Sequence, residues 1–177
     1  MQNDTTRPLA SGLTVMGALA RVLPHLPNFA PVGSISLFAG ARMRGWQAYA
    51  LPLVLMAVTD PFVGGYSAAT PLIYTAFLIN VWIGTRLRCT ENPLKIGAGV
   101  VSGSLVFFLL TNFAWLAGSS MYPHTLAGVV QCYIAAIPFY GRTLASDVLY
   151  SAALFGLHAW LSRRVARAER VAALQTA

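Results

Sequence analysis

Charged residues are scarce in this chain of 177 residues: only 10% are Asp, Glu, Lys or Arg, and only five residues are acidic. A soluble domain carries roughly 25% charged residues, whereas 56% of this sequence is hydrophobic. The composition therefore argues against a soluble protein and indicates a membrane protein. At about 20 residues for each spanning helix, the chain has room for six spans with short loops and for no additional soluble domain.

Recognisable catalytic and nucleotide-binding motifs are also missing. The sequence has no nucleophile elbow with a Ser-His-Asp set, no H-E-x-x-H motif, no glycine-rich phosphate loop and no paired carboxylates. Without a Walker motif, the chain cannot hydrolyse ATP by itself. We therefore predict that the protein is not an enzyme. A small membrane enzyme with His25 or Asp60 as its acid or base is the weakest alternative that the residues leave open.

Cysteine is rare, with Cys89 and Cys132 as the two examples. They fall on opposite sides of the expected membrane, so we expect no disulfide between them. Neither has the C-x-x-C spacing of a metal site, and no metal site is predicted from these residues. No small-residue cleavage site follows the first apolar run, so a cleaved signal peptide is not expected.

The basic residues gather at every second junction between hydrophobic segments. The clusters are Arg42 and Arg44, then Arg86, Arg88 and Lys95, then Arg163, Arg164, Arg167 and Arg170. Lys and Arg are retained on the cytoplasmic side, so we predict that these junctions and both termini are cytoplasmic in a bacterial inner membrane. The net charge of +7 then reflects topology and does not indicate nucleic-acid binding.

The apolar segments predict an all-α, polytopic bundle of six transmembrane helices that forms one domain over residues 1–177. The expected helices cover residues 8–24, 29–43, 46–60, 68–87, 94–117 and 142–166. The second and third are short for full spans, which tilt or local thinning of the bilayer can accommodate. Pro123 and Pro138 interrupt the stretch 122–141, where we expect a short helix at the outer surface.

Pairs of small residues recur within these segments at a spacing of four. Ser36 and Gly40 form one pair, and Gly99 and Gly103 form another. Such pairs let two helix backbones approach closely. We expect them to mark contacts within the bundle.

Polar residues gather at the junctions expected on the outer side. The ionisable ones are Arg21, His25, Asp60, Arg142 and Asp147. Ionisable groups inside a membrane bundle are costly and tend to be functional. Asn28, Tyr74 and Tyr122 lie at a similar depth. A few convergent polar groups among aromatic side chains suit an amphipathic organic ligand.

Structural roles stay open for several of these residues. Arg21 could extend outward or pair with Asp60, and Asp60-Pro61 is also a good start for a turn. Arg142 could anchor its helix at the interface. Asp147 lies a full turn inside its expected helix, where a carboxylate needs a partner or a water-filled cavity.

Four blocks of sequence carry a resemblance to a known family. They are residues 21–32 (RVLPHLPNFAPV), residues 50–60, residues 111–115 (TNFAW) with Tyr122-Pro123, and residues 132–140 (CYIAAIPFY). Together they resemble a family of small bacterial membrane proteins similar to the substrate-binding S-components of energy-coupling factor vitamin transporters, which includes the BtuM-like proteins implicated in cobalamin uptake. The resemblance covers nearly the whole chain. It implies six helices, both termini inside, and a vitamin pocket that opens to the outside.

The resemblance also implies roles for individual residues. The positions that match those around the corrinoid in BtuM-like proteins are His25, Asp60, Tyr74 and Arg142. In those proteins a cysteine at the start of the fourth helix is a ligand to cobalt, but the matching residue here is Ala69. Cobalt coordination would then need His25, His124 or Cys132, or would not occur. Of these three residues, His25 is the candidate cobalt contact.

The sequence thus predicts a membrane protein that captures a vitamin-sized ligand, cobalamin or a related corrinoid, from the outer face. The expected binding residues are His25, Asn28, Asp60, Tyr74, Tyr122, Arg142 and Asp147. The expected partners are this ligand, the lipid bilayer and an energising ABC-type module, with no nucleic acid and no catalytic cofactor. Ala10, Thr14 and Ala18 only approximate the Ala-xxx-Ala face used for docking on such a module, so a solitary transporter stays open. The alternatives are a similar transporter for a different vitamin and a membrane scaffold or assembly subunit.

Overall fold

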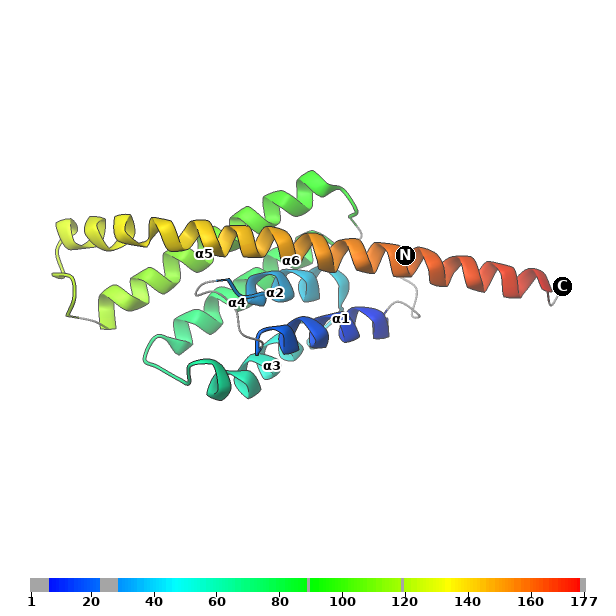
Figure 1. The fold of residues 1–177 in the computed structure, drawn as a ribbon, viewed down its shortest axis with the longest axis horizontal. Coiled ribbons are helices and arrows are strands. Elements are labelled where there is room, and N and C mark those ends of the chain that lie inside the picture. The colour runs from blue at the N-terminus through cyan, green and yellow to red at the C-terminus, as the bar shows by residue number, and fades with distance from the viewer. Residues whose placement is uncertain (1–6, 23–28, 89, 119, 176–177) are drawn as a thin grey trace.

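The computed structural model describes residues 7–22, 29–88, 90–118 and 120–175, which contain six helices and no strand (Figure 1). The helices are α1 (Arg7–Ala20), α2 (Val32–Arg42), α3 (Gln47–Val63), α4 (Thr70–Arg86), α5 (Pro93–Gly118) and α6 (Leu126–Gln175). The predicted all-helical class is confirmed. Two helices, α5 and α6, are long and apolar enough to cross a membrane by their length and composition.

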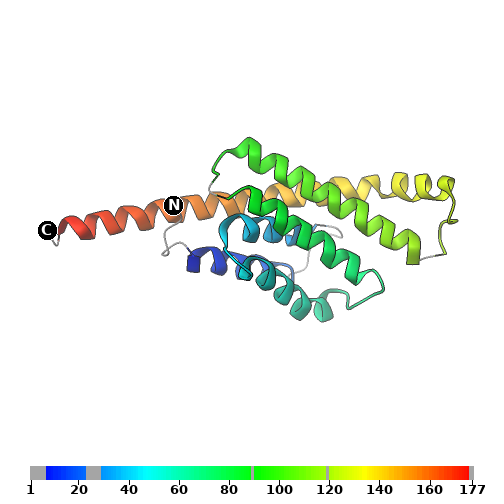
Figure 2. The ribbon, with the colours of Figure 1, turned by 180° about the vertical axis from the view of Figure 1, so that it is seen from behind.

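Successive helices run in opposite directions (Figures 1 and 2). α1, α3 and α5 run one way, and α2, α4 and α6 run back. The start of α1 and the end of α6 therefore lie toward the same end of the bundle, which also holds the α2–α3 turn with Arg44 and the α4–α5 turn with Arg88. We call this the basic end. The opposite end, where α1, α3 and α5 finish, carries Asp60 and Tyr66.

The centre of the bundle is α2, which contacts all five other helices. Every one of its 11 residues except Gly33 is buried. A helix of this length extends only about 17 Å, roughly half of a hydrocarbon core. The helix is shorter than the expected 29–43, while the bounds of α1, α3, α4 and α5 lie within a few residues of expectation.

Close approach of helices depends on glycine at two predicted positions. A methyl group on Gly40 of α2 would collide with the carbonyl oxygen of Val81 on α4, and Gly84 of α4 fits α2 in the same way. Gly103 of α5 leaves room for the side chain of Asn80. The prediction that these small residues mark contacts within the bundle is confirmed for both glycines.

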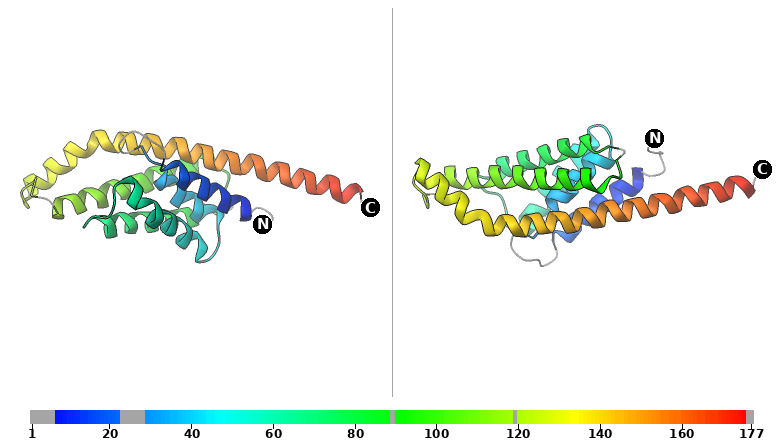
Figure 3. Two further views of the ribbon diagram at one scale, coloured as in Figure 1. Left: turned by 60° about the horizontal axis from the view of Figure 1, so that its bottom comes forward. Right: turned by 90° about the horizontal axis from the view of Figure 1, so that it is seen from above.

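The longest helix, α6, differs from the sequence-based prediction. A short helix within 122–141 and a separate helix at 142–166 were expected, but α6 is continuous for 50 residues and holds Pro138 in its interior. A proline removes one N–H donor and bends a helix without having to end it. Figure 3 shows the bend in the first third of α6. The last part of α6 extends beyond the other helices and is largely exposed (Figure 1).

Candidate functional site

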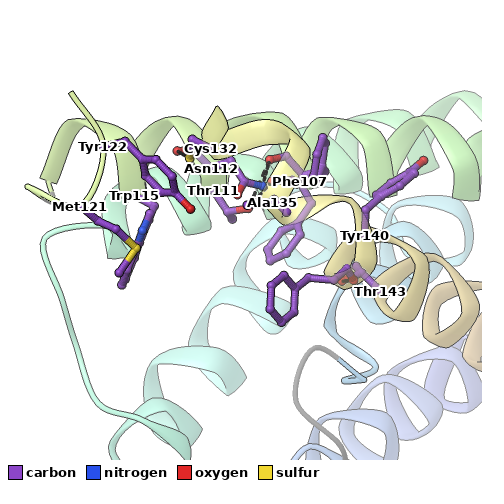
Figure 4. Close-up of a pocket in the computed structure, with 13 residues that line it drawn as sticks. Phe107, Thr111, Asn112, Trp115, Met121, Tyr122, Cys132, Ala135, Tyr140 and Thr143 are labelled. Carbon is purple, nitrogen blue, oxygen red and sulfur yellow. Dashed lines mark hydrogen bonds between the residues drawn. The ribbon is translucent and has the colours of Figure 1, made fainter. Parts of the chain in front are cut away.

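A cavity of about 490 Å³ lies between the second half of α5 and the first part of α6, at the end opposite the basic end (Figure 4). It is lined by Phe107, Phe108, Thr111, Asn112, Trp115, Met121, Tyr122, Cys132, Ala135, Ala136, Phe139, Tyr140 and Thr143. A volume of this size is typical of a pocket for a small organic molecule. We refer to it as the α5–α6 pocket.

Six of the thirteen residues that line the pocket are aromatic. Figure 4 shows Trp115 and Tyr122 toward one end of the pocket and Tyr140 toward the other. The ring of Phe108 contacts that of Tyr140, with 5.0 Å between their centroids. Phe108 also meets the ring of Tyr133 at 5.6 Å, and the Tyr133 hydroxyl donates to the carbonyl oxygen of Leu109 at 2.8 Å, which ties α6 to α5. Contacts between rings and a hydrogen bond between α6 and α5 therefore hold the aromatic part of the wall in place. Such a surface suits a flat, largely apolar ligand.

The polar groups of the pocket come from both helices and from the loop between them. The Thr111 hydroxyl donates to the carbonyl oxygen of Phe107 at 2.8 Å, and the Asn112 amide nitrogen donates to that of Phe108 at 2.7 Å. Because these donors bond within α5, the side chains can offer a ligand their oxygen acceptors. Cys132 adds a thiol that is only 2% exposed.

A second polar cluster joins three helix ends beside this region. Arg21, just after α1, pairs with Asp60 of α3 through Nη2 and Oδ1 at 2.6 Å. The Tyr74 hydroxyl of α4 donates to the other carboxylate oxygen, Oδ2, at 2.5 Å, and Arg21 Nη1 donates to the Thr59 hydroxyl at 2.8 Å. Both oxygens of Asp60 are therefore engaged within the protein, and the cluster fastens α1, α3 and α4 together. Of the two possibilities for Arg21, the structure shows the ion pair.

The aromatic packing of α4 connects this cluster to the pocket. Tyr74 and Phe107 both pack around a small core that includes Phe77. The rings of Phe77 and Phe107 are stacked, with centroids 5.2 Å apart. A shift of α4 at the Asp60 cluster would therefore reach the pocket wall through one pair of rings.

The predicted binding residues do not form one site in the described structure. Tyr122 lines the pocket, and Asp60 with Tyr74 forms the neighbouring cluster. Arg142 is exposed on α6 and lies outside the pocket lining. Asp147 is 4% exposed and buried inside the bundle. His25 and Asn28 lie outside the described residues.

The sequence was compared with known proteins. Residues 2–171 match a family described as a family of unknown function, DUF6580. The chain belongs to this family. Neither the curated proteins nor the solved structures gave a significant match.

In this DUF6580 member, two of the sequence blocks noted above supply most of the pocket. Nine of the thirteen lining residues lie in residues 111–115, Tyr122 and residues 132–140. The sequence prediction missed Phe107, Phe108 and Phe139 as binding residues, because aromatic side chains in an apolar helix look the same whether they face lipid, core or cavity.

Two of the residues considered as cobalt donors in place of a cysteine at position 69 lie in the described part of the chain, His124 and Cys132, and their surroundings differ. Cys132 lines the pocket. His124 Nε2 donates to the carbonyl oxygen of Leu116 at 2.9 Å, and this bond ties the segment before α6 to the end of α5. Ala69 itself directly precedes α4. Among the described donors, the thiol is the one placed at the pocket.

Proposed function

We propose that this protein is a six-helix protein of the bacterial inner membrane that captures a vitamin-sized ligand, cobalamin or a related corrinoid, from the outer face. The observation that carries the proposal is the aromatic α5–α6 pocket at the end of the bundle opposite the basic residues. The resemblance to S-components agrees with a binding function, and the ligand class comes from that resemblance.

The orientation follows from the charges at the two ends of the bundle. Arg44, Arg86 and Arg88 lie at the turns of the basic end, and the arginines of the α6 tail extend beyond it. Positive residues stay in the cytoplasm, so the basic end faces inward with both termini. The pocket then opens toward the outer leaflet. The long, apolar α5 and α6 cross the whole bilayer, and α2 lies inside the bundle.

The pocket's chemistry matches part of a corrinoid. A corrin ring is flat and carries amide groups at its rim, so its faces can pack on Tyr140 and Trp115 while its amide N–H groups donate to the oxygen of Asn112. Cys132 and Met121, which line the pocket, carry the soft sulfur atoms that suit the cobalt of a corrinoid. A complete cobalamin is larger than a cavity of about 490 Å³, so its nucleotide part would extend through the mouth of the pocket.

An equilibrium titration of the purified, detergent-solubilised protein with cyanocobalamin tests the proposal. We expect saturable changes in corrinoid absorbance, and about tenfold weaker binding by Tyr140→Ala, because one aromatic contact of this kind contributes about 1–1.5 kcal/mol. Tyr66→Ala is the matched control, since Tyr66 is 60% exposed and lies outside the pocket. Absence of binding by folded protein would contradict the corrinoid, and equal loss in both variants would contradict the pocket.

The contribution of Arg142 can be measured in the same titration. Its neighbour Thr143 lines the pocket, while Arg142 is exposed. An exposed guanidinium can reach only the part of a ligand that protrudes. We therefore expect Arg142→Ala to weaken binding less than Tyr140→Ala but more than Arg163→Ala, which changes the tail at the other end of the bundle.

A further inference from the structure

Asp147 of α6 lies deep in the bundle, where two other helices hold its carboxylate. The Ser104 hydroxyl of α5 donates to Oδ2 at 2.5 Å. The Ser34 hydroxyl of α2 lies 2.9 Å from the backbone oxygen of Asp147 and 3.4 Å from Oδ1. Asp147 is 4% exposed and both serines are 1% exposed. Neither ion pair found among the described side chains involves Asp147, so its charge is not balanced by a basic residue there.

Two further polar side chains point into the same enclosed space without hydrogen-bond partners among the described residues. Asn80 of α4 is 1% exposed, and both its amide oxygen and its amide nitrogen are unpaired. Ser151 of α6 is 2% exposed, and its hydroxyl is unpaired. Both residues line this space together with Asp147, Ser34 and Ser104. Buried polar groups in folded proteins are nearly always satisfied, so this concentration of unpaired groups points to a bound species.

Two glycines make the space for these oxygen atoms. A methyl group on Gly33 would press against the carboxylate of Asp147, and one on Gly103 would collide with the amide oxygen of Asn80. The enclosed space is too small to admit a water molecule. The arrangement therefore fits a species smaller than water.

We propose that Asp147, Ser34, Ser104, Asn80 and Ser151 form a binding site for a dehydrated sodium ion. Each of these side chains has an oxygen atom with a lone pair that a cation can share, and oxygen atoms are the ligands that hard cations take. One carboxylate balances one positive charge, whereas a divalent ion would leave an excess charge in a low-dielectric interior. A proton would neutralise Asp147, but it would leave the amide oxygen of Asn80 and the hydroxyl oxygen of Ser151 without a partner.

The enclosed polar space borders a groove on its side toward the basic end. A groove of about 350 Å³ between α5 and α6 shares Val100 and Ser151 with the enclosed polar space. Glu91 and Arg163 stand in the wall of this groove. An ion entering there would pass Ser151 before it reached Asp147. Because the site lies between α5 and α6, its occupant would also set the spacing of the two helices that form the ligand pocket.

Thermal unfolding of the full chain in NaCl, KCl and choline chloride at equal ionic strength tests the sodium site. We expect a saturable rise in Tm with Na⁺ alone, reaching about 5–10 °C when the ion exceeds its Kd by about 100-fold. Asp147→Asn should abolish the rise, and Ser151→Ala should shift it to higher Na⁺ concentration. Ser102→Ala is the matched control, because Ser102 is exposed on α5.

Three results would overturn the proposal. One is an equal Tm of the wild-type protein in all three salts, which requires no variant to fold. Another is an unchanged sodium response in Asp147→Asn or in Ser151→Ala. The third is a Tm that follows pH but not Na⁺ and loses this dependence in Asp147→Asn, which would assign a proton to the site instead.

Discussion

Replacing Asp60 with Asn removes the charge that fastens three helix ends. The Arg21 and Asp60 side chains are only 14% and 7% exposed, and their closest atoms are 2.6 Å apart. Removing one partner of a buried pair leaves the other charge uncompensated, at a cost of about 3–5 kcal/mol. At about 2–4 °C per kcal/mol for a protein of this size, Asp60→Asn should lower Tm by roughly 6–20 °C.

The chain contains its own control for this prediction. Arg163 and Glu91 form an ion pair at 3.1 Å whose side chains are 75% and 64% exposed. Such a pair contributes about 0–1 kcal/mol, so Glu91→Gln should lower Tm by less than about 4 °C. The two variants make the same chemical change at buried and exposed positions.

The assay is thermal unfolding of the purified variants, with a double-mutant cycle of Arg21→Gln and Asp60→Asn. The combined variant should be less destabilised than the sum of the two single variants, because removing both charges leaves neither one buried alone. An Asp60→Asn protein no less stable than Glu91→Gln would refute the reasoning, as would strict additivity in the cycle.

Three further predictions concern packing, the pocket and the orientation. Gly40→Ala should destabilise the protein by about 1–3 kcal/mol, because the new methyl group meets the α4 backbone. Gly97→Ala, with open space around its position, should be neutral or up to about 1 kcal/mol stabilising in the same unfolding assay. Equal effects of the two variants would contradict the close crossing of α2 and α4. Trp115→Phe should lose most of the tryptophan quenching that a bound corrinoid causes, since Trp115 lines the pocket, and unchanged quenching would place the ligand elsewhere. The orientation can be tested in a chain whose native cysteines are replaced by serine. Ala68→Cys should react with a membrane-impermeant thiol reagent on intact cells, and Gln47→Cys only after permeabilisation, because these exposed residues lie at opposite ends of the bundle. The reverse pattern would contradict the proposed orientation.

The arrangement of the two ends could be predicted from the sequence. Basic residues and polar residues alternate from one helix junction to the next, and the structure gathers them at opposite ends because successive helices are antiparallel. Gly40 and Gly103 were also predictable as helix contacts, since a missing side chain is a local property that the sequence shows directly.

The site was harder to predict because sequence gives depth along a helix but not the direction that a residue faces in the bundle. Arg142 and Asp147 lie at similar depth, but five residues of helix rotate them about 140° apart. One is exposed and the other is buried against α2 and α5. Asp60 was expected to contact ligand, whereas its two oxygens bond to Arg21 and Tyr74.

The continuity of α6 was not predictable from local rules either. Pro138 was expected to interrupt the stretch 122–141, ahead of a separate helix at 142–166, yet α6 continues through it. Residues on both sides of Pro138 pack against α5, with Tyr133 before it and Tyr140 after it in contact with Phe108. Tertiary packing of this kind can offset the loss of a backbone hydrogen bond.

The most direct test of the central claim is the binding of radiolabelled cobalamin to sealed membrane vesicles of known orientation. Right-side-out vesicles carrying the wild-type protein should bind it saturably, while inside-out vesicles and vesicles with Tyr140→Ala should bind far less. Equal binding in both orientations, or no binding in vesicles that contain folded protein, would contradict capture of a corrinoid from the outer face.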